Sequence, residues 1–293
     1  MSTKKIHYPK NILLNDHIIP YESAYIPVFD RGFLFGDGIY EVMVREKHGV
    51  FFQAAHLDRL QENLHKIGLQ YDISKIEKQI PELLLRNDLQ SETALIYIQV
   101  TRGVAPRKHA YPDNPSPTLF MYAVPYTITP VNTSNITAVV VPDYRWQRCD
   151  IKTTSLMGNT MANEAAHLRN ADEAVFVRDG RITEGSHCNI FFVRDGMVYT
   201  HPADTHILNG ITRKIVIALC RQHRIPVKET AWEAIALEQA DEAFLSGTTV
   251  QIASIARLGE HTYYEGDNCG PVTRTLQQAF ADLKKTDTTQ QKL

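Results

Sequence analysis

The amino-acid sequence predicts a mixed α+β (mixed α/β) protein with two domains, and three observations support this prediction. The chain has 293 residues, which suits one large or two medium domains. Paired strand-like runs dominate, and strands do not alternate regularly with helices, which disfavours a doubly wound nucleotide-binding fold. A stretch at 126–135 mixes Pro, Thr, Ser and Asn and has the composition of an interdomain linker. We therefore expect a small N-terminal α/β domain at 1–125 and a larger C-terminal domain at 136–293.

In the N-terminal domain, turn residues separate runs that are rich in β-formers. Asn15-Asp16-His17 and Lys47-His48-Gly49 each lie between two such runs, so two hairpins are expected. Apolar residues at helical spacing predict amphipathic helices at 55–68 and around 76–84. The loop at 102–117 is polar and contains prolines, and loops of this length are often functional. The expected strands are 12–14, 18–19, 39–44, 50–52, 95–101 and 119–124.

The C-terminal domain is expected to begin with a strand at 136–141. Arg-Asp-Gly occurs at 178–180 and again at 194–196, each time between apolar runs, which predicts two hairpins with tight turns. The polar residues 284–293 are expected to fray. The other expected elements are a helix at 211–224, a buried strand at 242–246 and a closing helix at 272–283.

Composition excludes several classes of protein. With 31 basic and 33 acidic side chains the formal net charge is -2, too balanced for nucleic acid or a membrane surface as the main partner. The four cysteines are scattered and form no CxxC pair, so neither a metal site nor a disulfide framework is expected. No signal peptide is recognisable, and no apolar run reaches the ~20 residues that span a bilayer. A cytoplasmic enzyme or binding protein is expected.

Several common motifs are missing or coincidental. Gly36-Asp37-Gly38 does not match the dinucleotide-binding pattern, and no P-loop, HExxH or GxSxG sequence occurs. Glu62 to His65 and Glu164 to His167 have the Glu-x-x-His spacing of di-iron bundles. That site requires a four-helix bundle, whereas this chain is rich in strands, so we interpret both matches as coincidence.

Four short segments carry the chemical signal, although each is weak when taken alone. Residues 148–153 place Lys152 beside apolar residues, and residues 183–191 place Glu184 near the end of a hairpin arm. Residues 208–213 begin a helix after a glycine turn, and residues 246–249 form a turn of small residues after a buried strand. A single lysine or glutamate is ordinarily solvated, so the interpretation depends on their joint occurrence.

In order and spacing, these segments resemble the fold type IV pyridoxal-phosphate enzymes. This family includes D-amino acid aminotransferases, branched-chain aminotransferases and aminodeoxychorismate lyase, and the resemblance covers nearly the whole chain. It implies a two-domain fold type IV architecture whose C-terminal domain binds pyridoxal 5'-phosphate through a Schiff base with Lys152. Such a lysine must reach its neutral amine, although the ordinary pKa of a lysine side chain is ~10.4.

The resemblance also implies roles for the residues around the cofactor. A carboxylate, here Glu184, would keep the ring nitrogen protonated. Free amide groups at the start of a helix would favour the phosphate, and an arginine would add a cation. The cofactor-binding residues implied are Arg59, Glu184, Leu208, Ile211, Thr212, Thr248 and Thr249.

The long loop distinguishes between members of the family. Arg107 and His109 are two residues apart and face the same way in an extended segment, and together they suit a carboxylate. With Tyr40 they resemble the substrate-carboxylate site of D-amino acid aminotransferases, in which this loop reaches the other subunit of a homodimer. The expected reaction moves an amino group between D-amino acids, such as D-alanine, and 2-oxo acids, such as 2-oxoglutarate.

Other functions remain open at this point. An (R)-amine transaminase, a branched-chain aminotransferase or aminodeoxychorismate lyase would use the same fold, and a binding or regulatory protein would use no chemistry. The sequence also departs from the D-alanine enzymes at His187, Cys188, Gly247 and Val44. These departures concern cofactor affinity and side-chain preference more than the type of reaction.

Overall fold

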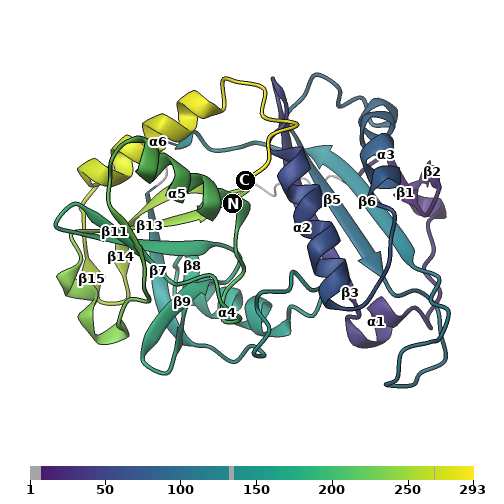
Figure 1. Cartoon of the computed structure of the whole chain (residues 1–293), viewed down its shortest axis with the longest axis horizontal. Helices are drawn as coiled ribbons and strands as arrows, with labels where there is room; N and C mark the ends of the chain where they lie inside the picture. Colours follow the sequence, from purple (N-terminus) through teal and green to yellow (C-terminus); the bar gives the residue numbers. More distant parts are fainter. Residues whose placement is uncertain (1–7, 132–134, 267) are drawn as a thin grey trace. The chain divides into compact units, whose positions relative to one another are not determined.

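The protein is described from a computed structural model that covers residues 8–131, 135–266 and 268–293 (Figure 1). Its contacts divide the chain into two compact units. Unit 1 comprises Met1–Ile128, Ile151–Ser155 and Asp287–Lys292, and unit 2 comprises Thr129–Asp150, Leu156–Thr286 and Leu293. Residues 132–134 of the expected linker lie outside the described residues. Among the described helices, none is long and apolar enough to cross a bilayer.

The described part of unit 1 contains one antiparallel sheet in the order β2-β1-β6-β5-β3-β4. The first predicted hairpin is confirmed, with Asn15 at φ 56° in its turn. Strand β5 alternates between buried and half-buried residues, so one face of the sheet carries the core. Its strands are β1 (Asn11–Leu14), β2 (His17–Pro20), β3 (Gly38–Glu46), β4 (Gly49–Val50), β5 (Ala94–Thr101) and β6 (Thr118–Pro125).

Two amphipathic helices cover that core face. Helix α2 packs on β3, whereas α3 packs on β1 and β6 (Figure 1). Leu60 and Ile80 of these helices belong to the same hydrophobic cluster as Met43 and Ile96 of the sheet. Helix α3 continues through Pro81, because the residues on either side of it keep their apolar stripe in the core. The helices are α1 (Arg31–Phe35), α2 (Gln53–Lys66) and α3 (Ile73–Arg86), with a short 3-10 turn, η1 (Tyr21–Ser23).

The C-terminal tail corrects the expectation that residues 284–293 fray. Thr288 is 2% exposed, and its hydroxyl accepts a hydrogen bond from Phe52 N at 3.1 Å. Thr289 O accepts a second bond from Ala54 N at 2.9 Å. The first amides of a helix have no hydrogen-bond partner within the helix, and the tail supplies such partners at the beginning of α2. Phe52 precedes α2 with φ 50°, which also ends the second hairpin earlier than predicted.

Unit 2 contains a mixed sheet in the order β12-β11-β10-β13-β14-β7-β8-β9, with β15 on β14, within the described residues. Both Arg-Asp-Gly hairpins are confirmed, since Asp179, Gly180, Asp195 and Gly196 all have positive φ. The strands are β7 (Asn135–Pro142), β8 (Glu173–Arg178), β9 (Arg181–Gly185), β10 (Asn189–Arg194), β11 (Met197–Thr200), β12 (Val227–Glu229), β13 (Glu242–Gly247), β14 (Gln251–Leu258) and β15 (His261–Thr262).

Helices cover part of this sheet and connect its parallel strands. Helix α4 links β7 to β8 and packs on both, and α5 links β11 to β12 (Figure 1). Helix α6 packs against α5, β13 and β14. The three helices are α4 (Met157–His167), α5 (Ile211–Gln222) and α6 (Pro271–Leu283), with a 3-10 segment, η3 (Ala234–Gln239).

Candidate active site

The residues predicted from the sequence fall into two groups, one in each unit. The first group, in unit 1, is Tyr40, Arg59, Arg107, His109 and Lys152. The second group, in unit 2, is Glu184, Leu208, Ile211, Thr212, Thr248 and Thr249.

Lys152 is tied to the sheet and to α2 through its main chain. Its carbonyl accepts a hydrogen bond from Tyr40 N at 3.0 Å, and its amide donates to Asn63 Oδ1 at 2.8 Å. The neighbouring Thr153 forms a β-bridge with Ile39. Lys152 Nζ lies 4.2 Å from the centre of the Tyr40 ring. The structure therefore brings the predicted Schiff-base lysine against one of the predicted substrate-binding residues.

Arg59 belongs to a buried charged cluster beneath β3. Arg59 Nε and Nη2 donate to the two oxygens of Glu41 at 2.7 and 2.9 Å, and His56 Nδ1 lies 2.8 Å from Glu41 Oε2. Burial alone would raise the pKa of Glu41, but Arg59 and His56 hold it well below its usual range. The pKa of His56 is lowered, mainly by burial. Arg59 Nη1 has no hydrogen-bond partner in the described residues, so this nitrogen can still donate to an anion.

Arg107 and His109 lie together on the ring of Phe35. The Arg107 guanidinium carbon is 5.2 Å from the ring centre, and the two rings of His109 and Phe35 are 5.9 Å apart. Both side chains are exposed. As predicted, the two residues share one side of the loop. Within the described residues of this chain, neither contacts Lys152 or Tyr40.

A network of buried arginines anchors the base of this loop. Asp37 accepts hydrogen bonds from Arg31 Nε at 2.7 Å and from Arg102 Nε at 2.9 Å. Arg31 Nη1 donates to Lys108 O at 2.6 Å, between the two predicted carboxylate-binding residues. Arg102 stacks on Tyr111, with 3.5 Å from its guanidinium carbon to the ring centre. The network therefore holds the main chain of the loop beside the side chains that project from it.

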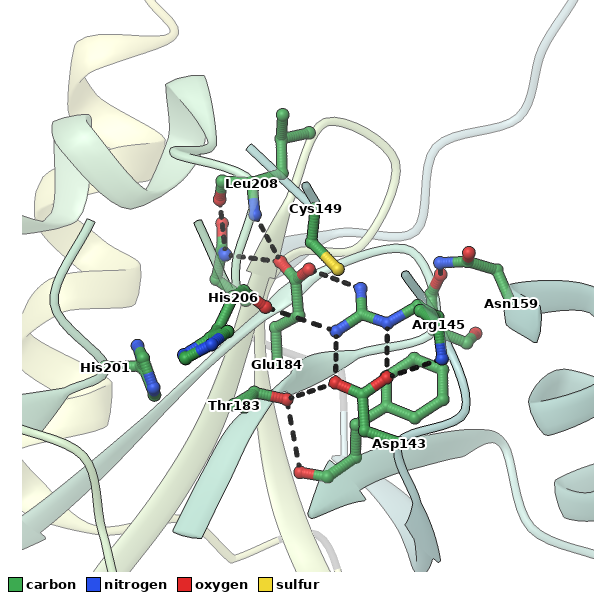
Figure 2. Close-up of polar contacts among 12 residues, drawn as sticks. Asp143, Arg145, Cys149, Asn159, Thr183, Glu184, His201, His206 and Leu208 are labelled. Carbon is green, nitrogen blue, oxygen red and sulfur yellow. Dashed lines mark hydrogen bonds and ion pairs between the residues drawn. The ribbon is translucent and has the colours of Figure 1, made fainter. Parts of the chain in front are cut away.

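In unit 2, Glu184 stands at the centre of a buried polar group (Figure 2). Its Oε1 accepts from Arg145 Nη1 at 2.5 Å, and its Oε2 accepts from Asn189 Nδ2 at 3.1 Å and from Leu208 N at 3.0 Å. Burial raises the pKa of the Glu184 carboxyl to about 7, although Arg145 acts in the opposite direction. Arg145 therefore does not fully compensate the negative charge of the ionised Glu184, and a nearby cation would stabilise it further.

Arg145 is itself fixed by its neighbours. Its Nε and Nη2 both donate to Asp143 at 3.0 Å, and its guanidinium lies 4.1 Å from the centre of the Phe176 ring (Figure 2). The carboxylate of Asp143 also lies 3.1 Å from Arg178 Nη2. Arg145 thus divides its positive charge between Asp143 and Glu184.

Asn189 connects Glu184 to a set of anion donors. Gly210 precedes α5, and a Cβ at Gly210 would lie 2.3 Å from Asn189 Oδ1, so a larger residue there would force the Asn189 amide to shift. Gly210 provides no side-chain cap, which leaves the amides of Ile211 and Thr212 free of intrahelical partners. Across the sheet, Asn189 pairs with Ser246, after which the chain turns.

The turn after β13 adds hydroxyl groups to this set. In the described part of the chain, the hydroxyls of Thr212, Thr248 and Thr249 make no hydrogen bonds. Ser246 Oγ is buried and likewise lacks a partner there. An orphaned buried hydroxyl is uncommon without a ligand or water. The buried carboxylate and these donors fit the ring nitrogen and the phosphate of the pyridoxal phosphate that the sequence predicts.

Two of the four departures from the D-alanine enzymes contact a different carboxylate, Glu173. His187 Nδ1 lies 2.9 Å from Glu173, and Cys188 Sγ donates to the same side chain at 3.2 Å. Val44 is buried in the core of unit 1. At Gly247, a Cβ would lie 3.0 Å from Val250. Apart from Gly247, these residues lie outside the segments whose hydroxyl and amide groups would bind the phosphate.

Sequence reasoning missed the residues that support the predicted ones. Asp143 and Arg145 directly follow the predicted strand at 136–141, and charged residues at the end of a buried strand were a signal that could have identified them. Asn189 begins β10 within a segment already selected. His56 and Glu41 carried no local signal, because their pairing joins a helix to a strand.

Comparison with known proteins relates most of the chain to one family. The family model described as amino-transferase class IV matches residues 38–258. The chain is 39% identical over 279 residues to the D-alanine aminotransferase of Listeria monocytogenes serotype 1/2a (strain 10403S), covering 92% of this chain and 95% of that one. It is 37% identical to the D-alanine aminotransferase of Staphylococcus haemolyticus, covering 92% and 96% of the two chains.

Solved structures give the same fold. The branched-chain amino acid aminotransferase of Escherichia coli superposes with a TM-score of 0.87 at 24% identity, covering 96% of both chains. The branched-chain aminotransferase of Thermoproteus uzoniensis, solved with norvaline, superposes with a TM-score of 0.84 at 25% identity, covering 94% of this chain and 95% of that chain.

Proposed function

The chain belongs to the class IV aminotransferases, and on this premise we propose that it transfers amino groups between D-amino acids, such as D-alanine, and 2-oxo acids, such as 2-oxoglutarate. The observation that carries the proposal is the placement of Lys152, whose main chain is bonded to Tyr40 and Asn63 and whose Nζ lies against the Tyr40 ring. The preference for D-amino acids is supported by the relatives named D-alanine aminotransferase and by the Arg107 and His109 pair.

We further propose pyridoxal 5'-phosphate as the cofactor. Lys152 would hold it covalently, and it would supply the electron sink that allows the α C–H bond of the amino acid to break. Glu184 would hold a proton at the ring nitrogen, because a buried carboxylate that receives only one nitrogen of Arg145 is stabilised in its ionised form by a further cation. The residues proposed to hold the phosphate are Arg59, Ile211, Thr212, Thr248 and Thr249. Leu208, whose amide donates to Glu184, is proposed to lie beside the cofactor.

Lys152 has the second role of moving the proton. The free amine of Lys152 would take the α-proton of the amino acid and would return it as an acid in the reverse direction. Tyr40 lies against Nζ and limits the directions from which Lys152 can approach the substrate. The stereochemistry then depends on how the substrate carboxylate is held relative to Lys152.

We propose that Arg107 and His109 bind that carboxylate in the site of a partner subunit. Arg107 offers a planar fork and His109 one further donor, which together suit a carboxylate. A homodimer is supported by exposed apolar side chains on the loop and on residues 25–33, a segment that the Asp30–Val104 bridge joins to the loop, because patches of this kind mark interaction surfaces. The most exposed of them are Tyr25 79%, Val28 65%, Phe29 56%, Phe33 74%, Val104 51% and Tyr111 58%.

A coupled assay tests the reaction. With 2-oxoglutarate as acceptor, the enzyme should turn over D-alanine and show little activity with L-leucine or 1-phenylethylamine. Arg107→Ala should raise KM for D-alanine about 10- to 100-fold, because a hydrogen bond to a charged group is lost. Activity confined to L-leucine would instead indicate a branched-chain aminotransferase, and an unchanged KM would contradict the carboxylate role of Arg107.

We also propose that the enzyme works in the cytoplasm as a homodimer. Cys149, Cys188 and Cys220 are buried free thiols, and Cys269 is a free thiol as well, which suits a reducing compartment. Sedimentation of the purified protein should give twice the mass of the chain. A monomer with full activity would contradict a site shared between subunits.

A further inference from the structure

The loop between β11 and α5 brings two histidines and an aspartate together. His201 follows β11, and Asp204 and His206 lie further along the same loop. One ligand atom from each side chain lies within 4.8 Å of the others. The Asp204 carboxylate is 3.8 Å from His206 Nδ1 and 3.7 Å from His201 Nδ1, and His201 Nδ1 also lies 2.9 Å from Pro202 O, a contact that a metal ion at this nitrogen would replace. The centres of the two rings are 6.1 Å apart, and both rings lie to the left of Glu184 in Figure 2.

These separations are close to those around a small metal ion. Nitrogen and oxygen ligands at about 2.0–2.2 Å from a tetrahedral Zn²⁺ lie roughly 3.3–3.6 Å from each other. Small rotations of Asp204 and His206 would close the remaining gap, and both side chains have room to rotate because they are 44% and 39% exposed. The same exposure lets water occupy the fourth position.

The backbone of the loop is held in place independently of a metal ion. Cys149 N donates to Thr205 O at 2.8 Å, and Asp204 N donates to Pro202 O at 2.8 Å. Asp204 Oδ1 accepts from His206 N at 2.8 Å, which keeps the carboxylate beside the second histidine. The three side chains therefore start near one another, and binding requires little ordering of the main chain.

We propose that His201, Asp204 and His206 form a binding site for a divalent transition-metal ion such as Zn²⁺ or Ni²⁺. Imidazole nitrogens combined with one carboxylate suit these metals, whereas Mg²⁺ and Ca²⁺ prefer oxygen ligands. The site uses no cysteine, which is why the cysteine pattern of the sequence did not indicate it. The inference is independent of the proposed transamination.

The proposed metal site adjoins the support of Glu184. His206 O accepts from Arg145 Nη2 at 3.4 Å, and Leu208 N, two residues later, donates to Glu184. Figure 2 shows the two histidines on one side of Glu184 and Arg145 on the other. A metal ion at His201 and His206 would therefore stiffen the segment that holds this carboxylate.

Calorimetric titration of the holoenzyme, after treatment with a chelator and dialysis, tests the site. ZnCl₂ and NiCl₂ should each bind at one ion per chain, and MgCl₂ should not bind. Asp204→Asn and His206→Asn should each weaken Zn²⁺ binding by more than about tenfold, since even supporting residues of metal sites change affinity 10- to 100-fold. At the same concentration, Zn²⁺ should raise the Tm of the wild type more than that of either variant.

His167→Asn provides the matched control. His167 is an exposed histidine at the end of α4 and lies outside the cluster, so this variant should bind Zn²⁺ like the wild type. Circular dichroism establishes that each variant is folded. The proposal is overturned if the wild type binds no Zn²⁺, if Mg²⁺ binds equally well, or if the Asp204→Asn, His206→Asn double variant keeps wild-type affinity for Zn²⁺.

Discussion

Two buried carboxylates, one in each compact unit, contact an arginine and respond in opposite ways. Glu41 in unit 1 receives two nitrogens of Arg59, and His56 lies against its second oxygen. Glu184 in unit 2 receives a single nitrogen of Arg145. The pKa of Glu41 is held well below its usual range, whereas burial raises that of Glu184 to about 7.

The difference lies in how each arginine divides its charge. Arg59 has Glu41 as its carboxylate partner, so the pair is nearly neutral. Arg145 also donates twice to Asp143, which leaves Glu184 with part of one positive charge to offset its burial. The first arrangement is a closed ion pair that stabilises the fold. The second is an open one, suited to hold a further cation such as a protonated ring nitrogen.

The largest effect is expected for the lysine beside the closed pair. Asn63 links Lys152 to α2, the helix that carries Arg59, so the cluster positions the residue that would perform the chemistry. Lys152→Ala should lower kcat by about 10²- to 10⁴-fold or more, because a general base and the covalent attachment are both lost. Borohydride reduction followed by mass spectrometry should find the cofactor attached to the wild type and not to the variant.

Lys75→Ala serves as the control for this measurement, because Lys75 is an exposed lysine on α3. It should keep wild-type activity and the reduced adduct. A Lys152→Ala enzyme that retained the adduct would show that another lysine holds the cofactor.

Opening the closed pair should have the largest effect on stability. Glu41→Gln leaves Arg59 buried without its compensating charge, and loss of one partner of a buried ion pair costs about 3–5 kcal/mol in the free energy of unfolding. Urea denaturation would measure this loss. Glu82→Gln is the matched control: Glu82 pairs with Arg86 on the surface, where the effect should stay below about 1 kcal/mol. Equal effects of the two substitutions would show that the Glu41 cluster is not a closed pair.

Most of the fold was predictable because its signals are local. The turns at Asn15, Asp179 and Asp195 take positive φ where the sequence places turn residues. Helix α4 was not predicted. Its buried residues among those described are the small Ala162 and Ala166, so the sequence shows no strong apolar stripe there. The tail was wrongly expected to fray, since the bonds of Thr288 and Thr289 join residues that are far apart in sequence.

The candidate site divides in the same way. Lys152, Glu184 and the start of α5 were selected from four short segments that occur together and in order, and their roles stay predictions. Arg145 and Asn189 could not be predicted, because their role arises only when a loop and a strand edge meet Glu184 in three dimensions. The opposite behaviour of the two carboxylates was equally hidden, since it depends on burial and on the sharing of Arg145.

A pH series should separate the open pair from the closed one. The pKa of Glu184 is raised from 4.5 to about 7, so its protonated form is favoured in the folded state. Its contribution to stability is fully present below pH 4.5 and is lost as the pH rises through about 7, by roughly 3 kcal/mol in the cofactor-free enzyme. Glu184→Gln should remove this loss, as urea denaturation between about pH 5 and 8 would show.

Cofactor affinity should change in the opposite direction, because the ionised Glu184 binds a protonated ring nitrogen. Affinity should therefore rise through about pH 7 in the wild type and remain flat in Glu184→Gln. The lowered pKa of Glu41 places its own effect below this window, so Glu41 adds no slope there. A slope that survives in Glu184→Gln would assign the titration to another group.

Asp37 extends the comparison to a carboxylate that receives two arginines. Arg31 and Arg102 are 3% and 1% exposed, and both donate to Asp37. One carboxylate cannot use all of their donors, so Arg31 also bonds Lys108 O, and Arg102 bonds Ile67 O at 2.8 Å. The surplus donors of this site hold the main chain of the loop that carries Arg107.

The smallest effect on activity is expected when Arg31 loses its extra hydrogen-bond donors but the positive charge is kept. Arg31→Lys cannot bond Asp37 and Lys108 O together, so the loop should lose about 1 kcal/mol of positioning and KM for D-alanine should rise several-fold while kcat changes little. Steady-state kinetics would measure both constants, with Arg86→Lys on the exposed face of α3 as the control. A fall in kcat with an unchanged KM would show that Asp37 and its arginines act on the reaction itself and not through the loop.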